Sequence, residues 1–430
     1  MAKNTPLSLR NLTIYQVYVR NHSETGDFHG LIKDLDRIQA LGVDVLYLIP
    51  IHPVGQVNRK GTLGSVYSIA DYRAINPEYG TMEDFKRLIA ETHQRGMKLM
   101  IDIVFNHTSH ASKLYQEHPE WFYHRDGKPT NRVGDWYDII DLDFSHRPLW
   151  DYLLETLEFY VELGVDGYRC DVAPLVPLDF WLEARERINR INPNFIWLSE
   201  SVHKSFIKYI RDLGFEAHSD GEMYQAFDIL YDYDIFDYLH HYLKGEVSLQ
   251  TYLTEIYNQE MIYPSNYVKL RNLENHDQPR IASFVSSRRI LNHLHGFLFF
   301  QKGAAMIYAG QECFNTHRPS LFDRDPVDWS NLDSDHCVPL LQRLIQIKKD
   351  PIMATGIFNI VNVPHDHLAV MTYENQEKIR YGFFHFKDED VTLTLDLPKG
   401  TYSNLVDGST IQIEDSITVK ETPIIIDVMK

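Results

Sequence analysis

The stretch MKLMIDIVF, residues 97–105, is almost unbroken in apolar side chains and is the clearest guide to the fold. Such a run is typical of a β-strand that is covered on both faces, as in a parallel sheet with helices on either side. A helix is predicted before it, beginning at Thr81 with a capping-box pattern to Asp84 and ending at Gly96. A helix followed by a buried strand is the repeating unit of an α/β protein.

The same unit recurs along most of the chain. Eight stretches are expected to form strands, the sixth of them poorly defined: residues 13–19, 43–50, 97–105, 164–172, 194–200, 215–230, 268–275 and 304–310. The alternation of strands and helices predicts a parallel sheet, and eight repeats favour a closed (β/α)8 TIM barrel. A doubly wound open sheet is the competing fold. It is weakened because no GxGxxG or Walker-type loop follows any of the strands.

Two segments break this rhythm. Residues 108–144 are polar and aromatic with little periodicity, and we expect a short subdomain inserted after the third strand. Further on, the apolar pattern changes to period two, as in VTLTLDL (391–397), which predicts a C-terminal antiparallel β-sandwich over residues 353–430. The catalytic barrel is therefore assigned to residues 1–107 and 145–352.

Composition narrows the class of function. The 430 residues include 60 Asp and Glu against 42 Lys and Arg, which gives a formal net charge of -18. Such a chain repels nucleic acid and anionic membrane surfaces, so its partner is expected to be neutral or cationic. No run approaches the roughly 20 apolar residues of a membrane span, and the first residues lack the apolar core of an export signal. With three cysteines that show no zinc spacing, the sequence predicts a cytoplasmic protein with free thiols, and it indicates no particular oligomeric state.

Charged and polar side chains stand at the ends of several predicted strands, where the chemistry of a barrel of this kind takes place. They are Asp102, Asn106 and His107 after the third strand, Arg169 and Asp171 after the fourth, Glu200 after the fifth, and Asn275, His276 and Asp277 after the seventh. A single carboxylate there is often only the N-cap of the next helix. Three carboxylates brought together repel one another, so their convergence indicates a site that needs charge.

Gathered carboxylates suit either metal binding or acid/base chemistry. Two of them can cleave a glycosidic bond, one by attacking the anomeric carbon and the other by protonating the departing oxygen. Arg169 lies two residues before Asp171, so both side chains share one face of the strand and the cation favours an ionised nucleophile. Glu200 follows the apolar run FIWL (195–198), which is expected to raise its pKa and keep it protonated as a general acid.

Short motifs in this chain resemble those of the alpha-amylase family, glycoside hydrolase family 13, and occur in the family's order. The four signature regions are matched by DIVFNH (102–107), GYRCD (167–171), WLSE (197–200) and LENHD (273–277). Further similar stretches are IYQVYVR (14–20), GSVYSIADY (64–72), IIDLD (139–143) and MIYAGQE (306–312). The resemblance runs from about residue 12 to the end of the chain and implies a barrel, an inserted subdomain and a C-terminal β-sandwich.

The resemblance also implies residue roles. The nucleophile falls on Asp171, the general acid/base on Glu200, and the third acid, which grips sugar hydroxyls, on Asp277. Further residues are implied to orient the nucleophile or to hold the sugar, namely Arg169, His107, His276 and Tyr67, the last as the aromatic on which the ring stacks. His203 is expected to contribute to the neighbouring sugar site.

The implied reaction is a double displacement through a covalent glucosyl ester, with carboxyl groups about 5 to 5.5 Å apart and no organic cofactor. Asn106 and Asp143 match family positions for calcium ligands, and hard oxygen donors suit calcium. However, VAPL (172–175) stands where many members carry Lys-His, used for substrate and for calcium. A structural calcium ion is therefore left open.

Several functions remain compatible with these residues. The favoured one is a retaining hydrolase of alpha-1,4-glucosidic bonds in maltodextrin or starch-type oligosaccharides. A glucanotransferase would use the same three acids with a sugar in place of water. A carbohydrate-binding protein on an inactive scaffold is disfavoured because all three acids are present. The hypothesis of a metal hydrolase is less favoured still, since no His pair at ligand spacing accompanies the acids.

Overall fold

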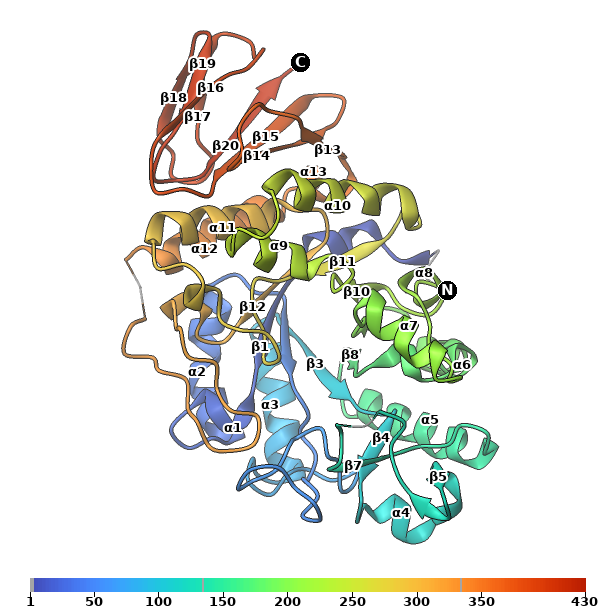
Figure 1. The fold of residues 1–430 in the computed structure, drawn as a ribbon. Helices are drawn as coiled ribbons and strands as arrows, with labels where there is room; N and C mark the ends of the chain where they lie inside the picture. The colour runs from blue at the N-terminus through green and yellow to red at the C-terminus, as the bar shows by residue number, and fades with distance from the viewer. Residues whose placement is uncertain (1–3, 134, 333–334) are drawn as a thin grey trace.

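The computed structural model describes residues 4–133, 135–332 and 335–430. Within these residues, parallel strands close into a barrel in the order β1-β12-β11-β10-β9-β8-β3-β2 (Figure 1). The strands are β1 (Thr13–Val17), β2 (Val45–Leu48), β3 (Lys98–Ile103), β8 (Gly167–Cys170), β9 (Ile196–Ser199), β10 (Ile229–Tyr231), β11 (Val268–Arg271) and β12 (Ala304–Tyr308). The predicted (β/α)8 barrel is confirmed, and the open doubly wound sheet was wrong.

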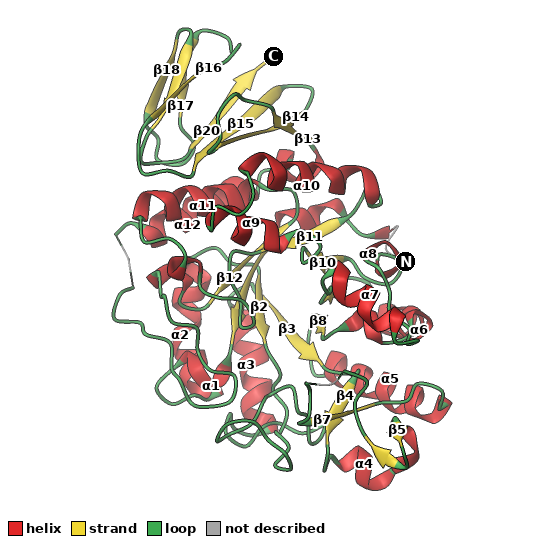
Figure 2. Cartoon of the chain, in the orientation of Figure 1, coloured by secondary structure: helices red, strands yellow, loops and turns green. Residues whose placement is uncertain are grey.

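Helices connect the strands and lie around the barrel (Figure 2). The larger ones are α2 (Phe28–Ala40), α3 (Met82–Gln94), α5 (Arg147–Glu162), α6 (Leu178–Ile191), α7 (Lys204–Asp212), α9 (Phe236–Leu243), α10 (Leu249–Ile262), α11 (Arg288–Phe300) and α12 (Cys337–Lys348). The helices α1 (Val19–His22), α8 (Asp220–Met223) and α13 (Ile352–Thr355) are single turns. The predicted capping box of α3 is present, since the Thr81 hydroxyl accepts from the Asp84 N–H and the Asp84 carboxylate accepts from the Thr81 N–H.

The sixth strand is much shorter than the stretch predicted for it. Only Ile229–Tyr231 is extended, while residues 215–228 form loops, turns and α8. The strand ends at Tyr231, where acidic residues follow it. Asp232 and Asp234 pair with Arg271 and Lys269 of β11, which is the more favourable arrangement for buried charges.

The segment between β3 and α5 carries its own small elements. Strand β4 (His107–Ser109) pairs with β7 (Ile139–Asp141) in antiparallel fashion, so that His107 lies opposite Asp141. Between them lie α4 (Lys113–Glu117) and a hairpin of β5 (His124–Arg125) and β6 (Lys128–Pro129). We call residues 108–144 the insert. Its two ends therefore form a ribbon that leads directly from the third barrel strand.

The C-terminal residues form antiparallel sheets beyond α11 and α12 (Figure 1). A four-stranded sheet has the order β13-β14-β15-β20, with strands at Ile357–Val361, Leu368–Glu374, Lys378–His385 and Ile424–Met429. Two pairs complete the domain: β16 (Val391–Thr394) with β19 (Ser416–Val419), and β17 (Gly400–Ser403) with β18 (Thr410–Ile413). Val370, Leu393 and Ile417 belong to one buried cluster shared by these sheets. The predicted antiparallel domain is confirmed.

None of the helices in the described part of the chain combines the length and apolar character that crossing a bilayer demands. The three cysteines, Cys170, Cys313 and Cys337, are buried and form no disulfide with one another.

Candidate active site

A cavity of about 290 Å³ lies where several barrel strands end, and we call it the acid cavity. Asp171 and Glu200 each follow the last residue of a strand, β8 and β9, and both line it. Asp277, Tyr67 and His107 line it as well. Five of the residues predicted from the sequence are thus brought together although they are up to 210 positions apart (67 to 277).

Arg169 lies beneath this cavity and is fully buried. Its Nη1 donates to Asp171 Oδ1 at 2.9 Å and to both oxygens of Asp102 at 3.0 Å. Its Nη2 lies 2.7 Å from Glu200 Oε1. One guanidinium therefore holds three carboxylates, rather than serving the nucleophile candidate Asp171 alone as the sequence indicated.

Glu200 is buried, but its partners are polar and not the apolar neighbours expected from FIWL (195–198). Its Oε1 faces Arg169, and its Oε2 accepts from the backbone N–H of Val172 at 2.7 Å. Val172 has φ +34°, in the left-handed region that a β-branched residue rarely adopts. Strained backbone of this kind is found at functional sites, and here it directs an N–H towards the carboxylate.

Burial and mutual repulsion set the protonation of the two acids. The pKa of Asp171 is raised, first by burial and then by the charge of Glu200, while Arg169 opposes the shift. The pKa of Glu200 is raised by burial, again against Arg169. Two adjacent carboxyls of this kind titrate as a pair, so that they hold one proton between them over part of the pH range. An ionised nucleophile beside a protonated acid is such a state.

Asp277 differs from both because it is more exposed and close to a histidine. Its Oδ2 lies 3.1 Å from His276 Nε2. Burial acts to raise the pKa of Asp277, but His276, together with Arg169 and Arg318, outweighs it and lowers that pKa to about 2. His276 is held in turn by Tyr67, whose hydroxyl is 2.6 Å from Nε2, and by Gln16 at Nδ1. Asp277 is therefore a fixed negative charge on the cavity wall.

His107 and Tyr67 complete the wall. His107 Nε2 lies 4.0 Å from Asp171 Oδ2, and burial lowers the pKa of His107 to about 4. The imidazole is thus neutral at pH 7 and can donate or accept a hydrogen bond without adding charge. The Tyr67 ring is stacked on His276 with an interplanar angle of 13°, and its hydroxyl also donates to Asp102.

His203 is outside the set of residues that line the acid cavity. It is stacked on Tyr233 with the ring centroids 5.2 Å apart, and its Nδ1 lies 3.1 Å from Asp237 Oδ2. The hydrogen bond with Asp237 raises the pKa of His203. Tyr233 in turn accepts a hydrogen bond from Asn275, two residues before Asp277. His203 therefore does not line the acid cavity, although it interacts electrostatically with Glu200, which does.

Several cavity residues were missed by sequence reasoning. They are Lys60, Ser65, Trp136, Asp138, Ile139, Val172, Leu321 and Phe322. Most lie in long loops without periodicity, where no local pattern predicts direction. The one available signal was the aromatic and acidic composition of DWYD (135–138). Lys60 Nζ lies 2.9 Å from Asp138 Oδ1, so this pair joins the loop after β2 to the insert across the rim.

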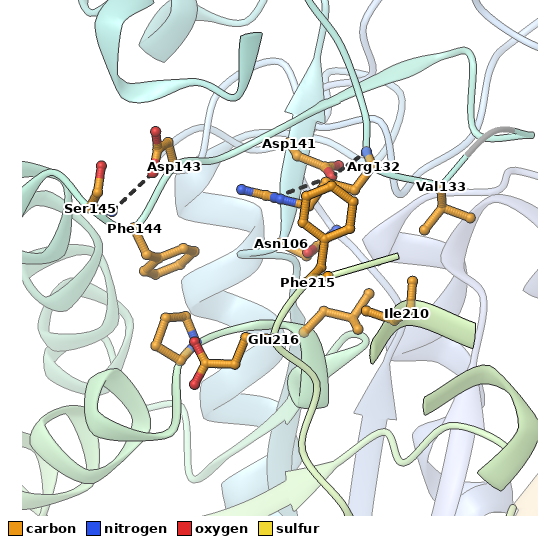
Figure 3. A pocket seen from close by; sticks show the side chains of 13 residues that line it. Asn106, Arg132, Val133, Asp141, Asp143, Phe144, Ser145, Ile210, Phe215 and Glu216 are labelled. Atoms are coloured by element: carbon orange, nitrogen blue, oxygen red, sulfur yellow. Dashed lines mark hydrogen bonds and ion pairs between the residues drawn. The ribbon is translucent and has the colours of Figure 1, made fainter. Parts of the chain in front are cut away.

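The two residues predicted as calcium ligands do not line the acid cavity. Asn106 and Asp143 line a second cavity of about 340 Å³ together with Asp141 and Arg132 (Figure 3). We call it the insert cavity. Among the residues that the structure describes, no group of three or more His, Cys, Asp or Glu side chains is arranged to hold a metal ion.

Comparison with known proteins matches this architecture over nearly the whole chain. Residues 16–352 match the family model for the alpha amylase catalytic domain, and residues 355–426 match that for the bacterial alpha amylase C-terminal domain. A crystal structure of an alpha-amylase from Lactobacillus plantarum shares 45% sequence identity with a TM-score of 0.95, covering 98% of this chain and 100% of that chain.

Curated relatives are more distant and longer. Alpha-amylase MalA of Haloarcula japonica is 26% identical over 97% of this chain, which spans 62% of that protein. The alpha-1,4-glucan:maltose-1-phosphate maltosyltransferase of Picrophilus torridus is 30% identical over 85% of this chain and 59% of its own length. The chain thus spans about three fifths of the length of these two relatives. Its catalytic-domain match nevertheless covers well over half of its residues, and the chain belongs to the alpha-amylase family.

Proposed function

We propose that this protein hydrolyses alpha-1,4-glucosidic bonds of maltodextrin-type oligosaccharides with retention at the anomeric carbon. The observation that carries the proposal is that Asp171 and Glu200 bind the two different nitrogens of one buried guanidinium at the acid cavity. This arrangement supplies the two carboxyls that a retaining glycosidase needs. Membership of the alpha-amylase family supports the choice of alpha-glucans as the substrate class.

In the first step, Asp171 attacks the anomeric carbon. Arg169 occupies Oδ1, which leaves Oδ2 as the attacking oxygen on the side of His107. The C–O bond to the leaving sugar breaks as the glucosyl–Asp171 ester forms. The leaving oxygen takes a proton from Glu200, so that no alkoxide has to depart.

In the second step, Glu200 acts as a base. Its carboxylate removes a proton from water, which attacks the ester and releases the sugar with its original configuration. Both oxygens of Glu200 face donors, Arg169 and the Val172 N–H. We propose that the sugar displaces one of these donors, which raises the pKa of Glu200 further and favours the protonated acid that the first step requires.

Asp277, His276 and Tyr67 hold the sugar in this proposal. The ionised Asp277 accepts hydrogen bonds from sugar hydroxyls, and Tyr67 offers an apolar ring face. His203, outside the acid cavity, would act on the neighbouring sugar together with Tyr233, on which it is stacked.

The test is digestion of maltoheptaose by the full chain. Shorter maltodextrins should appear, with the alpha anomer first in a time-resolved NMR spectrum. Asp171→Asn should remove the activity, while Asp212→Asn, at the exposed end of α7, should not. Initial release of the beta anomer, or an active Asp171→Asn variant, would contradict the proposal.

Transfer to a second sugar is the alternative, because a 30% identical relative is named as a maltosyltransferase. The glucosyl ester is the same in both reactions, and only the acceptor differs. Chromatography of products from concentrated maltotetraose distinguishes them. Chains longer than the substrate indicate transfer, and shorter chains alone indicate hydrolysis.

We also propose that the protein acts in the cytoplasm, which is supported by its three buried cysteines without disulfides. Fractionation of producing cells, followed by immunoblotting, tests this. The protein in the secreted fraction would contradict it.

A further inference from the structure

The insert cavity is lined by the acidic and amide side chains that the sequence suggested for calcium, but a cationic side chain lies among them. The oxygen-bearing side chains that line it are those of Asn106, Asp141, Asp143, Ser145 and Glu216. Arg132, from the loop between β6 and β7, extends into the same space (Figure 3). The question is whether these donors suit a metal ion or the guanidinium.

Arg132 uses the oxygens that a cation would need. Its backbone N–H donates to Asp141 Oδ2 at 2.8 Å, and its Nη1 lies 3.3 Å from the same oxygen. Both Nη atoms donate to the carbonyl oxygen of Leu142 at 3.2 Å. Calcium takes 6 to 8 oxygen ligands, whereas here two of the best oxygens already accept hydrogen bonds. A divalent ion beside them would also be repelled by the guanidinium charge.

Aromatic rings hold the guanidinium in this position. The Cζ atom of Arg132 is 4.7 Å from the centroid of Tyr123 and 5.7 Å from that of Phe215. Tyr123 belongs to the insert, whereas Phe215 follows α7 of the barrel. Tyr123 and Phe215 also contact each other edge to face at 5.8 Å. Figure 3 shows Phe215 beside Arg132, so the cation joins the insert to the barrel.

The other donors are weak candidates for a metal. The Nδ2 of Asn106 is 3.1 Å from His107 Nδ1, which fixes the amide. Asp143 is partly exposed and its Oδ1 accepts from the Ser145 N–H. Asp141 Oδ1 is buried without a hydrogen-bond partner among the described residues, and it borders a cavity that has room for water. A water molecule can donate to this oxygen without any metal.

We infer that the Arg132 guanidinium is the built-in cation of the insert cavity and takes the structural place that a calcium ion would otherwise fill. The insert is then fixed to the barrel independently of metal supply. This inference concerns stability and does not depend on the proposed reaction.

Thermal unfolding of the full chain tests the inference. The melting temperature of the unchanged protein should be the same in EDTA and in millimolar calcium chloride. Arg132→Gln should lower it by a few degrees, and calcium should then restore part of the loss, because a ligand that binds only the folded state stabilises it. Arg132→Lys keeps a cation and should remain insensitive to calcium. Arg125→Gln is the matched control, since Arg125 lies over the Tyr123 ring but outside the insert cavity.

Two outcomes would overturn the inference. One is calcium-dependent stabilisation of the unchanged protein that disappears in Asp141→Asn, because the cavity would then bind the ion beside Arg132. The other is an equal calcium response of Arg132→Gln and Arg132→Lys. If Arg132→Gln fails to fold, calorimetric titration of calcium into the unchanged chain and into Asp141→Asn decides the matter alone. Saturable binding that Asp141→Asn abolishes contradicts the inference, and its absence supports it.

Discussion

The acid cavity and the insert cavity are both lined by residues of the β4–β7 ribbon or next to it, and beside each cavity a buried carboxylate pairs with an arginine. Asn106 lines the insert cavity and the next residue, His107, lines the acid cavity. On β7 and just before it, Asp138 faces the acid cavity and Asp141 the insert cavity. The same short segment of chain therefore contributes side chains to both cavities.

The difference between them lies in charge balance. Arg169 is shared by Asp102, Asp171 and Glu200, so negative charge remains in excess in the acid cavity. Arg132 pairs with a single carboxylate, that of Asp141, and its other partners are a carbonyl oxygen and aromatic rings. Uncompensated acids cost stability and are retained where chemistry uses them. A matched pair under aromatic rings serves to hold the structure.

The largest expected effect tests the acid cavity. Asp171→Asn should lower kcat on maltoheptaose by at least about 10⁴-fold, because an amide cannot form the glucosyl ester. Its melting temperature should hardly fall, since the change also relieves repulsion from Glu200. Enzyme kinetics and thermal unfolding on the same preparation check both. If Asp171→Asn lost its activity only because it unfolds, the acid cavity would have a structural role like that of the insert cavity, and the comparison would fail.

Removing each arginine compares the two cavities directly. Arg169→Leu should cost about 3–5 kcal/mol of unfolding free energy, since three buried carboxylates lose their cation. Arg132→Leu should cost less, about 1–3 kcal/mol, because only one buried carboxylate, that of Asp141, then lacks its cation. Loss of Arg169 raises the pKa of the remaining acids, so its cost should be smaller at pH 5 than at pH 8. Urea unfolding at both pH values measures this, and equal costs for the two variants would contradict the charge argument.

Asp141 gives the insert cavity a pH dependence of its own. Burial raises the pKa of Asp141 to about 6, with Arg132 opposing the shift. A carboxyl whose folded pKa exceeds its unfolded value takes up a proton on folding, so its contribution to stability is present at low pH and lost as pH rises. The contribution should fall by about 2–3 kcal/mol between pH 4 and pH 7. Asp141→Asn should abolish this part of the dependence of the unfolding free energy on pH, measured by urea unfolding at several pH values. A variant with the same pH dependence as the unchanged protein would contradict the prediction.

The smallest effect concerns the rim of the acid cavity. Lys60→Ala removes the ion pair with Asp138 and should raise KM for maltoheptaose by roughly two- to five-fold, with little change in kcat, since a partly exposed ion pair is worth at most about 1 kcal/mol. Lys86→Ala breaks an exposed pair with Glu83 away from either cavity and serves as the control. The same change in KM for both variants would show that the rim pair has no specific role.

Much of the fold was predictable because its signals are local. The unbroken apolar run around β3 and the capping box at Thr81 each depend on neighbours within a few residues. The sixth strand was misjudged because β10 is only three residues long and is fixed by ion pairs from Asp232 and Asp234 to the next strand. Such pairs join distant parts of the chain and leave no periodic pattern.

The candidate site was predictable in its composition but not in its connections. Asp171 and Glu200 were found because they directly follow strands, and Asp277 because it belongs to the motif LENHD (273–277) in the loop after β11. The sharing of Arg169 was not predictable, since its second and third partners come from other strands. Lys60 and Asp138 were missed for the same reason, being in loops whose paths depend on the whole molecule.

The sequence by itself determined the barrel, the position of the insert, the antiparallel C-terminal domain and the acids that face the acid cavity. These follow from periodicity and from short motifs, both of which are properties of neighbouring residues. Only the tertiary structure decided that Glu200 is held by Arg169 and a strained Val172 rather than by apolar neighbours, and that Arg132 occupies the place considered for calcium. Charge compensation depends on which side chains meet in space, and that is fixed only when the whole chain has folded.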